Sequence, residues 1–184
     1  MADGCRVVLV GMMGSGKTTI GRLLSERTGW SYHDNDELLA RLFRATPREI
    51  FASRGVAALR EAESRALALG LDAPPPCIVG APGGAILDEA SRRRLRAAGI
   101  VAWLRASAEE LKARAMGGAH RPWIDTGGGS WIAAAVDVRD PLYASVADIT
   151  LNTDGRSPRD TVRELLAELV AIDACRPHLP RAKD

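Results

Sequence analysis

A glycine-rich loop that follows a short apolar run constrains the fold of this chain more than any other sequence feature. Residues 11–18 read Gly-Met-Met-Gly-Ser-Gly-Lys-Thr and directly follow the apolar run 6–10. The spacing matches the pattern G-x-x-x-x-G-K-[S/T], in which backbone N–H groups and a helix N-terminus surround phosphate oxygens. We expect Lys17 to reach the β- and γ-phosphates of ATP and the Thr18 hydroxyl to bind Mg²⁺. The expected nucleotide-binding residues of this loop are Gly11, Gly14, Ser15, Gly16, Lys17, Thr18 and Thr19. A merely glycine-rich turn is the weaker reading, because motif and context agree.

Short apolar runs alternate with helical patterns along the rest of the chain. Continuous apolar runs are typical of strands in a parallel sheet whose two faces are both covered by helices. The sequence therefore predicts an α/β fold, a P-loop NTPase-type open parallel sheet of about five strands with helices on both faces. The predicted strands are 6–10, 30–33, 77–81, 100–104 and 149–151. The predicted helices are 17–28, 36–43, 56–69, 88–97, 108–115 and 158–171.

One stretch interrupts this alternation. Residues 116–138 are rich in glycine and poorly periodic, and such a segment is too long for a simple connection. We predict that it forms a mobile lid. The remaining chain up to residue 172 is expected to be one domain, and residues 173–184, with two prolines and several charges, a loosely ordered tail.

Composition narrows the possible partners. The 184 residues carry a formal charge of only +2, so the sequence favours neither a nucleic-acid partner nor a membrane surface. A chain of this length buries a sizeable core without disulfide or metal support. The three cysteines, Cys5, Cys77 and Cys175, have no metal-ligand spacing, which fits a reducing cytoplasm, and Cys77 is expected to be a buried thiol. We expect a cytoplasmic monomer that acts on a small molecule.

Further short motifs follow the phosphate loop in a fixed order. They are His-Asp-Asn-Asp at 33–36, Leu-Arg-Glu-Ala-Glu at 59–63, Pro-Gly-Gly at 82–84, Arg-Pro at 121–122 and Arg-Asp-Pro-Leu-Tyr at 139–143. This ordered set resembles the shikimate kinases, and the resemblance spans residues 6–169. It implies a kinase that transfers the γ-phosphoryl group of ATP to a ring hydroxyl of shikimate, giving shikimate 3-phosphate. The alternatives are a kinase for another hydroxy acid such as gluconate, or a nucleotide-binding protein without turnover.

The resemblance also implies roles for single residues. Asp34 would hold Mg²⁺ together with Thr18, and Asp36 would bind the acceptor and take the proton of its attacking hydroxyl. Arg60 and Arg139 would grip the acceptor carboxylate, for which planar guanidinium groups are well suited. The further roles are charge stabilisation by Arg121, acceptor contacts by Gly83 and Gly84, and contacts to adenine by Arg114, Arg156 and Pro158.

Each of these residues also has a plain structural reading. Asp34 and Glu37 form a capping-box-like pair, and Asp36 could be an ordinary acid in a first helical turn. Arg60 could form a surface ion pair with Glu63 three residues on. Arg139 could be a solvated residue at a helix start. Arg121, before Pro122, could simply begin an extended loop, and a structural reading also stays open for Arg114 and Arg156.

Some positions depart from the family pattern. Proline 82 replaces the first glycine of a substrate-loop triplet, so a backbone donor is lost there. Val56 and Leu59 replace the usual glutamate and phenylalanine, and Trp123 replaces a common leucine. The glycines at 127–129 lie in the predicted lid and not after the third strand, so we do not assign them to the substrate loop. These departures concern the acceptor side, which leaves the identity of the acceptor the most open part of the prediction.

Overall fold

The computed structural model describes residues 4–116, 131–172 and 175. Its centre is a parallel sheet of five strands in the order β2-β3-β1-β4-β5. The strands are β1 (Arg6–Val10), β2 (Ser31–Asp34), β3 (Cys77–Gly80), β4 (Ile100–Arg105) and β5 (Ile149–Asn152). The five predicted strands and the parallel α/β fold are thus confirmed, with shifts of one residue at several strand ends.

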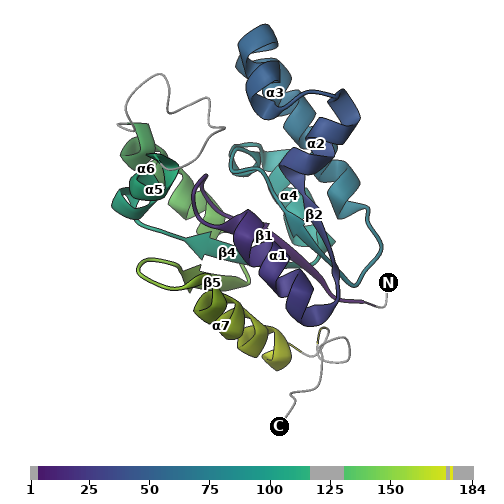
Figure 1. Cartoon of the computed structure of the whole chain (residues 1–184), viewed down its shortest axis with the longest axis vertical. Helices are drawn as coiled ribbons and strands as arrows, with labels where there is room; N and C mark the ends of the chain where they lie inside the picture. Colours follow the sequence, from purple (N-terminus) through teal and green to yellow (C-terminus); the bar gives the residue numbers. More distant parts are fainter. Residues whose placement is uncertain (1–3, 117–130, 173–174, 176–184) are drawn as a thin grey trace.

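Helices cover both faces of this sheet (Figure 1). The helices in the described ranges are α1 (Lys17–Thr28), α2 (Asn35–Phe43), α3 (Pro47–Leu71), α4 (Glu89–Ala98), α5 (Ala108–Met116), α6 (Trp131–Ala144) and α7 (Pro158–Ala171), with one 3₁₀ turn, η1 (Ala85–Leu87). None of the helices described is both long enough and apolar enough to cross a bilayer.

Two separate cores lie on the two faces of the sheet. Helices α1 and α7 pack side by side over one face, where Leu24 and Leu165 are fully buried in one apolar cluster with residues of β1 and β5. Residues from α3, α4, α5 and α6 fill the other face, among them Leu95 and Leu111. A third, smaller cluster joins α2 to α3. Burial on both faces explains why the three central strands, β1, β3 and β4, read as continuous apolar runs.

Helix α3 begins earlier than the sequence pattern predicts. Its first residues follow a capping box in which Thr46 accepts a hydrogen bond from the Glu49 N–H and the Glu49 carboxylate accepts one from the Thr46 N–H. Pro47 occupies the first turn, where a missing N–H costs nothing. Gly55 then breaks the helix with φ 77° and ψ −176°. The predicted helix 56–69 is the arm after this break.

The loop-like reading of residues 116–138 is wrong for its second part. Residues from Trp131 onward form α6, which continues through Pro141 to Ala144. Of the 14 residues of α6, two are buried, Ile132 and Tyr143. With so few buried positions, the helix shows little of the hydrophobic periodicity that identifies an amphipathic helix in a sequence. The other part of the predicted lid, residues 117–130, lies outside the described residues.

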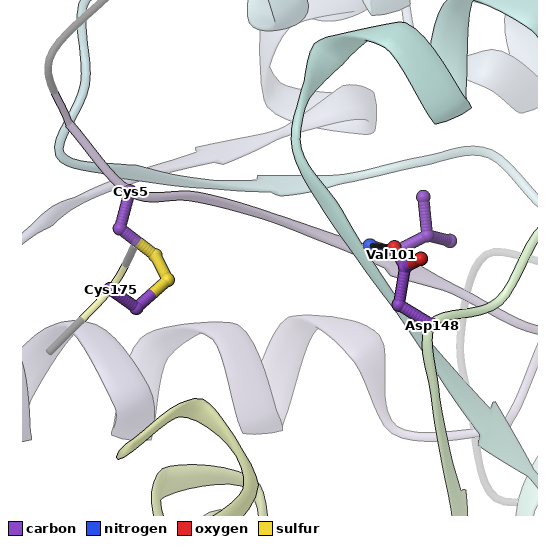
Figure 2. Close-up of a disulfide and its surroundings, with 4 residues drawn as sticks. All are labelled: Cys5, Val101, Asp148 and Cys175. Atoms are coloured by element: carbon purple, nitrogen blue, oxygen red, sulfur yellow. Dashed lines mark hydrogen bonds between the residues drawn. A yellow bond between two sulfur atoms is a disulfide. The ribbon is translucent and has the colours of Figure 1, made fainter. Parts of the chain in front are cut away.

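A disulfide between Cys5 and Cys175 contradicts the expectation of a chain without such support (Figure 2). It joins the residue before β1 to the C-terminal tail, across 170 residues of sequence. Cys175 is fully buried, so at this residue the tail is anchored and not loosely ordered as predicted. Two of three cysteines are therefore paired, and cysteine usage no longer argues for a reducing compartment. Cys77 is the free, buried thiol that the sequence predicted.

Candidate active site

A cleft of about 720 Å³ opens at the carboxyl ends of the central strands. It is bounded by the phosphate loop after β1, by Asp34 at the end of β2 and by Gly80 at the end of β3. Helices α3 and α6 contribute Arg60 and Arg139 to its walls. Parallel strands end at the same edge of a sheet, so motifs far apart in the sequence meet in this one cleft.

The phosphate loop has the backbone conformation that its glycines predict. Gly11, Gly14 and Gly16 have φ values of 145°, 88° and 98°, which side chains rarely tolerate. A Cβ atom on Gly11 would also lie 2.5 Å from the Leu104 carbonyl oxygen. Lys17 Nζ donates to the carbonyl oxygens of Gly11 and Met12, at 2.8 and 2.9 Å. The lysine thus folds over its own loop, with its charge at the site where the motif binds phosphate.

Two further loop residues bear on anion binding. The Ser15 hydroxyl is fully buried, and within residues 4–116, 131–172 and 175 it has no hydrogen-bond partner. A buried, unpaired hydroxyl costs free energy unless something binds it. Thr19 lies in the first turn of α1 and lines the cleft together with Thr18.

The carboxylate of Asp34 caps a helix, as its plain structural reading predicts, and also contacts Thr18 of the phosphate loop. Its Oδ1 caps α2 by accepting the backbone N–H of Asp36 at 2.9 Å and of Glu37 at 3.4 Å. Its Oδ2 accepts the Thr18 hydroxyl at 2.8 Å and the Tyr32 hydroxyl at 3.0 Å. Asp34 is therefore a helix cap that also turns one oxygen toward the phosphate loop. Asp36, in the first turn of α2, is exposed and lines the same cleft.

Sequence reasoning missed Tyr32 and Asn35 at this position. Burial, reinforced by the nearby charge of Asp34, raises the pKa of the Tyr32 phenol, so the group stays a hydrogen-bond donor. Asn35 lines the cleft although its side chain is buried, and within the described ranges its amide has no partner. Tyr32 belongs to no recognised motif, but side chains alternate along a strand, and this alternation would have placed Tyr32 on the same face as Asp34. Asn35 lies within the motif at 33–36, in which only the two aspartates were given roles.

Arg60 forms the ion pair of its plain structural reading and also lies in the cleft. Its Nη1 donates to the Glu63 carboxylate at 2.5 Å, which is the expected i, i+3 ion pair. Both residues also line the cleft. Burial raises the pKa of Glu63 although the charge of Arg60 opposes this shift. A Cβ atom on Gly84 would lie 1.9 Å from Arg60 Nη1, so this glycine leaves the space that the guanidinium occupies.

Arg139 is not the solvated residue at a helix start that the plain reading suggested. It lies inside α6, is partly buried, and lines the cleft, where its Nη1 lies 3.6 Å from Met12 Sδ of the phosphate loop. Its Nη1 lies 3.4 Å from the Gly83 carbonyl oxygen, which also accepts the Tyr143 hydroxyl at 2.8 Å. Burial lowers the pKa of Arg139. Tyr143 thus holds the Gly83 carbonyl group and links the glycine loop to α6. The sequence did not reveal this role.

The residues expected near adenine separate in the structure. Arg114 lines the cleft, donates to the Thr153 carbonyl oxygen at 2.7 Å, and reaches the Gly14 carbonyl oxygen at 3.5 Å. Arg156 instead pairs with Glu164 on the surface and lines a separate hollow along α7. Pro158 is the first residue of α7 and does not border the main cleft in the described part of the chain. Arg121 lies outside the described residues, as does Trp123.

The unusual acceptor-side residues gather in the same cleft. Val56, Leu59 and Pro82 all line it, together with Gly83 and Gly84. Val56 is 49% exposed, whereas Leu59 is buried at the joint between α2 and α3. The Pro82 carbonyl oxygen accepts the Ala85 N–H at 3.0 Å, so the proline starts the turn that leads into η1. Trp131, at the start of α6, also borders the cleft and packs on the core.

Comparison with known proteins agrees with this geometry. The family model "Shikimate kinase" matches residues 13–170. Shikimate kinases of Symbiobacterium thermophilum and Pseudomonas paraeruginosa are 39% and 37% identical; each alignment covers 89% of this chain and 95% of the relative. The structure of shikimate kinase from Acinetobacter baumannii in complex with shikimate superposes with a TM-score of 0.87 at 29% identity, covering 94% of this chain and 96% of that chain. The chain therefore belongs to the shikimate kinase family, phosphotransferases that use ATP to phosphorylate a hydroxyl group.

Proposed function

We propose that this protein phosphorylates a ring hydroxyl of shikimate with ATP, giving shikimate 3-phosphate, in the pathway to aromatic amino acids. The observation that carries the proposal is the cleft itself, which holds a phosphate loop, two neighbouring aspartates and two arginines from different helices. A phosphate donor and a small carboxylate acceptor both find matching charges there. Membership of the family supports the same reaction.

The nucleotide side of the cleft fits a nucleoside triphosphate. The loop amides, Lys17 and the unpaired Ser15 hydroxyl all favour bound phosphate oxygens. Thr18 and Asp34 provide hydroxyl and carboxylate oxygens, the ligand type that Mg²⁺ prefers, at the edge of the loop. Bound there, Mg²⁺ would neutralise charge on the phosphates. Arg114 lies beyond the loop, and we propose that it borders the adenine.

The acceptor side fits a small hydroxy acid. Arg60 and Arg139 can each present a planar guanidinium to a carboxylate, and Gly83 and Gly84 permit close approach to the backbone. With the carboxylate held there, a ring hydroxyl would point toward Asp36, which would accept its proton as the hydroxyl oxygen bonds to the γ-phosphorus. Lys17 would stabilise the charge of the transferring group, and ADP leaves with the bridging oxygen. Arg121 remains our candidate for additional stabilisation of that charge.

An acceptor panel tests this proposal. ADP release is measured with shikimate, quinate, gluconate and nucleoside monophosphates, each at a range of concentrations with saturating ATP and Mg²⁺. We expect shikimate to have a kcat/KM at least about a hundredfold above the other acceptors, because we propose that the spacing of its carboxylate and ring hydroxyl matches that of the two arginines and the aspartate. Preference for gluconate or another acid would refute shikimate as the acceptor. It would indicate that the unusual residues Val56, Leu59 and Pro82 shape the cleft for that other acid. ATP binding by calorimetry without turnover of any acceptor would favour a binding protein.

The remaining proposals concern setting and assembly. Use of ATP as the phosphate donor favours a cytoplasmic location. All the proposed donor and acceptor residues in the cleft come from one chain, which favours action as a monomer. The proposed reaction requires neither a nucleic-acid partner nor a membrane partner. Sedimentation equilibrium at micromolar concentration tests the monomer directly, and a stable dimer would refute it.

A further inference from the structure

The carboxylate of Asp34 has one hydrogen-bonding partner that no motif accounts for. Its Oδ2 accepts two hydroxyl groups, from Thr18 at 2.8 Å and from Tyr32 at 3.0 Å. Its Oδ1 is occupied by the two backbone N–H groups at the start of α2. Contacts at both oxygens thus fix the orientation of this carboxylate, and one of the groups that fix it is the phenol of Tyr32, two residues earlier on β2.

The ring of Tyr32 sits where two glycines leave room for it. A Cβ atom on Gly21 of α1 would lie 2.3 Å from Tyr32 Cε2, and one on Gly80 of β3 would lie 2.6 Å from the Tyr32 hydroxyl oxygen. Any side chain at either position would displace the ring. The phenol is therefore held between α1 and β3, with its hydroxyl directed at Asp34. A second, longer contact runs from this hydroxyl to the Lys17 carbonyl oxygen at 3.4 Å.

We propose that Tyr32 is a positioning residue for the metal-binding carboxylate: its hydroxyl fixes Asp34 Oδ2 beside Thr18, in the orientation that receives Mg²⁺ with the nucleotide. The inference rests on the proposed function, because it requires the magnesium site at Thr18 and Asp34. An ionised carboxylate offers about two acceptor sites on each oxygen, so the Tyr32 and Thr18 hydroxyls occupy both sites of Oδ2. With Mg²⁺ bound, a metal-bound water would take the site that the Thr18 hydroxyl occupies here, while the Tyr32 hydroxyl keeps the other site and holds the carboxylate in place.

A purely structural role for Tyr32 has different consequences. If the hydroxyl only joined β2 to α1, its loss would change thermal stability and leave the response to magnesium unaltered. If it orients Asp34, its loss weakens the contribution of magnesium to nucleotide binding. Hydrogen-bond partners of metal ligands typically contribute about ten- to a hundredfold to metal affinity. We expect the low end here, since Oδ1 keeps its two backbone contacts.

The test is calorimetric titration of ADP in Mg²⁺ and, separately, in EDTA, for wild type and Tyr32→Phe. The substitution keeps the ring in its seat and removes only the hydroxyl. In EDTA the two proteins should bind ADP equally; in Mg²⁺ the variant should bind about tenfold more weakly. Tyr143→Phe is the matched control, because it removes another buried phenol that donates to Gly83 and not to Asp34. In the Asp34→Asn background, Tyr32→Phe should have no further effect on the magnesium response.

The possible failures are distinguishable. If magnesium does not strengthen ADP binding by wild type, the proposed metal site is refuted, and this inference with it. If magnesium strengthens binding equally in wild type and Tyr32→Phe, the metal site stands and the role of Tyr32 is refuted. Equal weakening in EDTA and in Mg²⁺ would also refute it, because the effect would then not involve the metal.

Discussion

The disulfide between Cys5 and Cys175 makes a strong prediction about stability. Breaking it frees a loop of 170 residues in the unfolded chain. In the loop-entropy account a crosslink of this separation stabilises the folded state by about 5 kcal/mol, since the unfolded chain loses that much conformational freedom. For a chain of this size, 1 kcal/mol corresponds to about 2–4 °C in melting temperature. The expected loss is therefore about 10–20 °C.

The perturbation is the double substitution Cys5→Ala and Cys175→Ala, compared with wild type before and after reduction. Melting is followed by calorimetry with and without a phosphine reductant. Cys5 and Cys175 are 1% and 0% exposed, so reduction should be carried out on unfolded protein before refolding. The reductant should lower the melting temperature of wild type and leave the double variant unchanged. Cys77→Ala, which removes a buried thiol outside the disulfide, is the control and should keep the response to reductant.

The cleft lies at the opposite end of β1 from Cys5, so turnover at 25 °C should not depend on the disulfide. A shift below about 3 °C on reduction would refute the reasoning, since it would mean that the crosslink does not limit the unfolded chain. A large fall in kcat at 25 °C would contradict the separation of the disulfide from the site. In a reducing cytoplasm the relevant stability would be that of the reduced protein.

Three further predictions concern the cleft. Lys17→Met should lower kcat by at least about a hundredfold with an unchanged melting temperature, measured by ADP release; undiminished turnover would remove Lys17 from the mechanism. Arg60→Ala and Arg139→Ala should raise the KM for shikimate far more than the KM for ATP in steady-state kinetics. Equal effects on both substrates would argue against a carboxylate clamp. Gly84→Ala should resemble Arg60→Ala in its KM for shikimate, because the added methyl group would displace the guanidinium. An unchanged KM would show that Arg60 can move without loss of binding.

Much of the fold could be predicted because its signals are local. Each strand is a short apolar run, and the glycine-rich loop identifies both the strand before it and the helix after it. Parallel strands then bring Asp34, Gly83 and the loop to one edge without any further information. The capping role of Asp34 at the start of α2 could also be predicted. The contact of its second carboxylate oxygen with Thr18 could not, because it depends on how α1 packs against β2.

The missed features depend on contacts between distant residues. Helix α6 is rich in alanine and has few buried residues, so hydrophobic periodicity gives little signal there. The capping signal at Thr46 and Glu49 was present in the sequence, but the glycine break at 55 concealed the helix that it begins. Cys5 and Cys175 are 170 positions apart, and spacing alone cannot show that their Cα atoms lie 4.7 Å apart. Arg156 was expected in the site, yet Glu164 on the next helix holds it at the surface.

The most direct test of the account is a crystal structure with ADP, Mg²⁺ and shikimate bound. The account predicts that the shikimate carboxylate contacts the guanidinium groups of Arg60 and Arg139. It also predicts that one ring hydroxyl lies within hydrogen-bond distance of Asp36 and faces the β-phosphate of ADP. Shikimate bound with its carboxylate away from both arginines, or outside the cleft, would contradict the central claim that this cleft is the acceptor site.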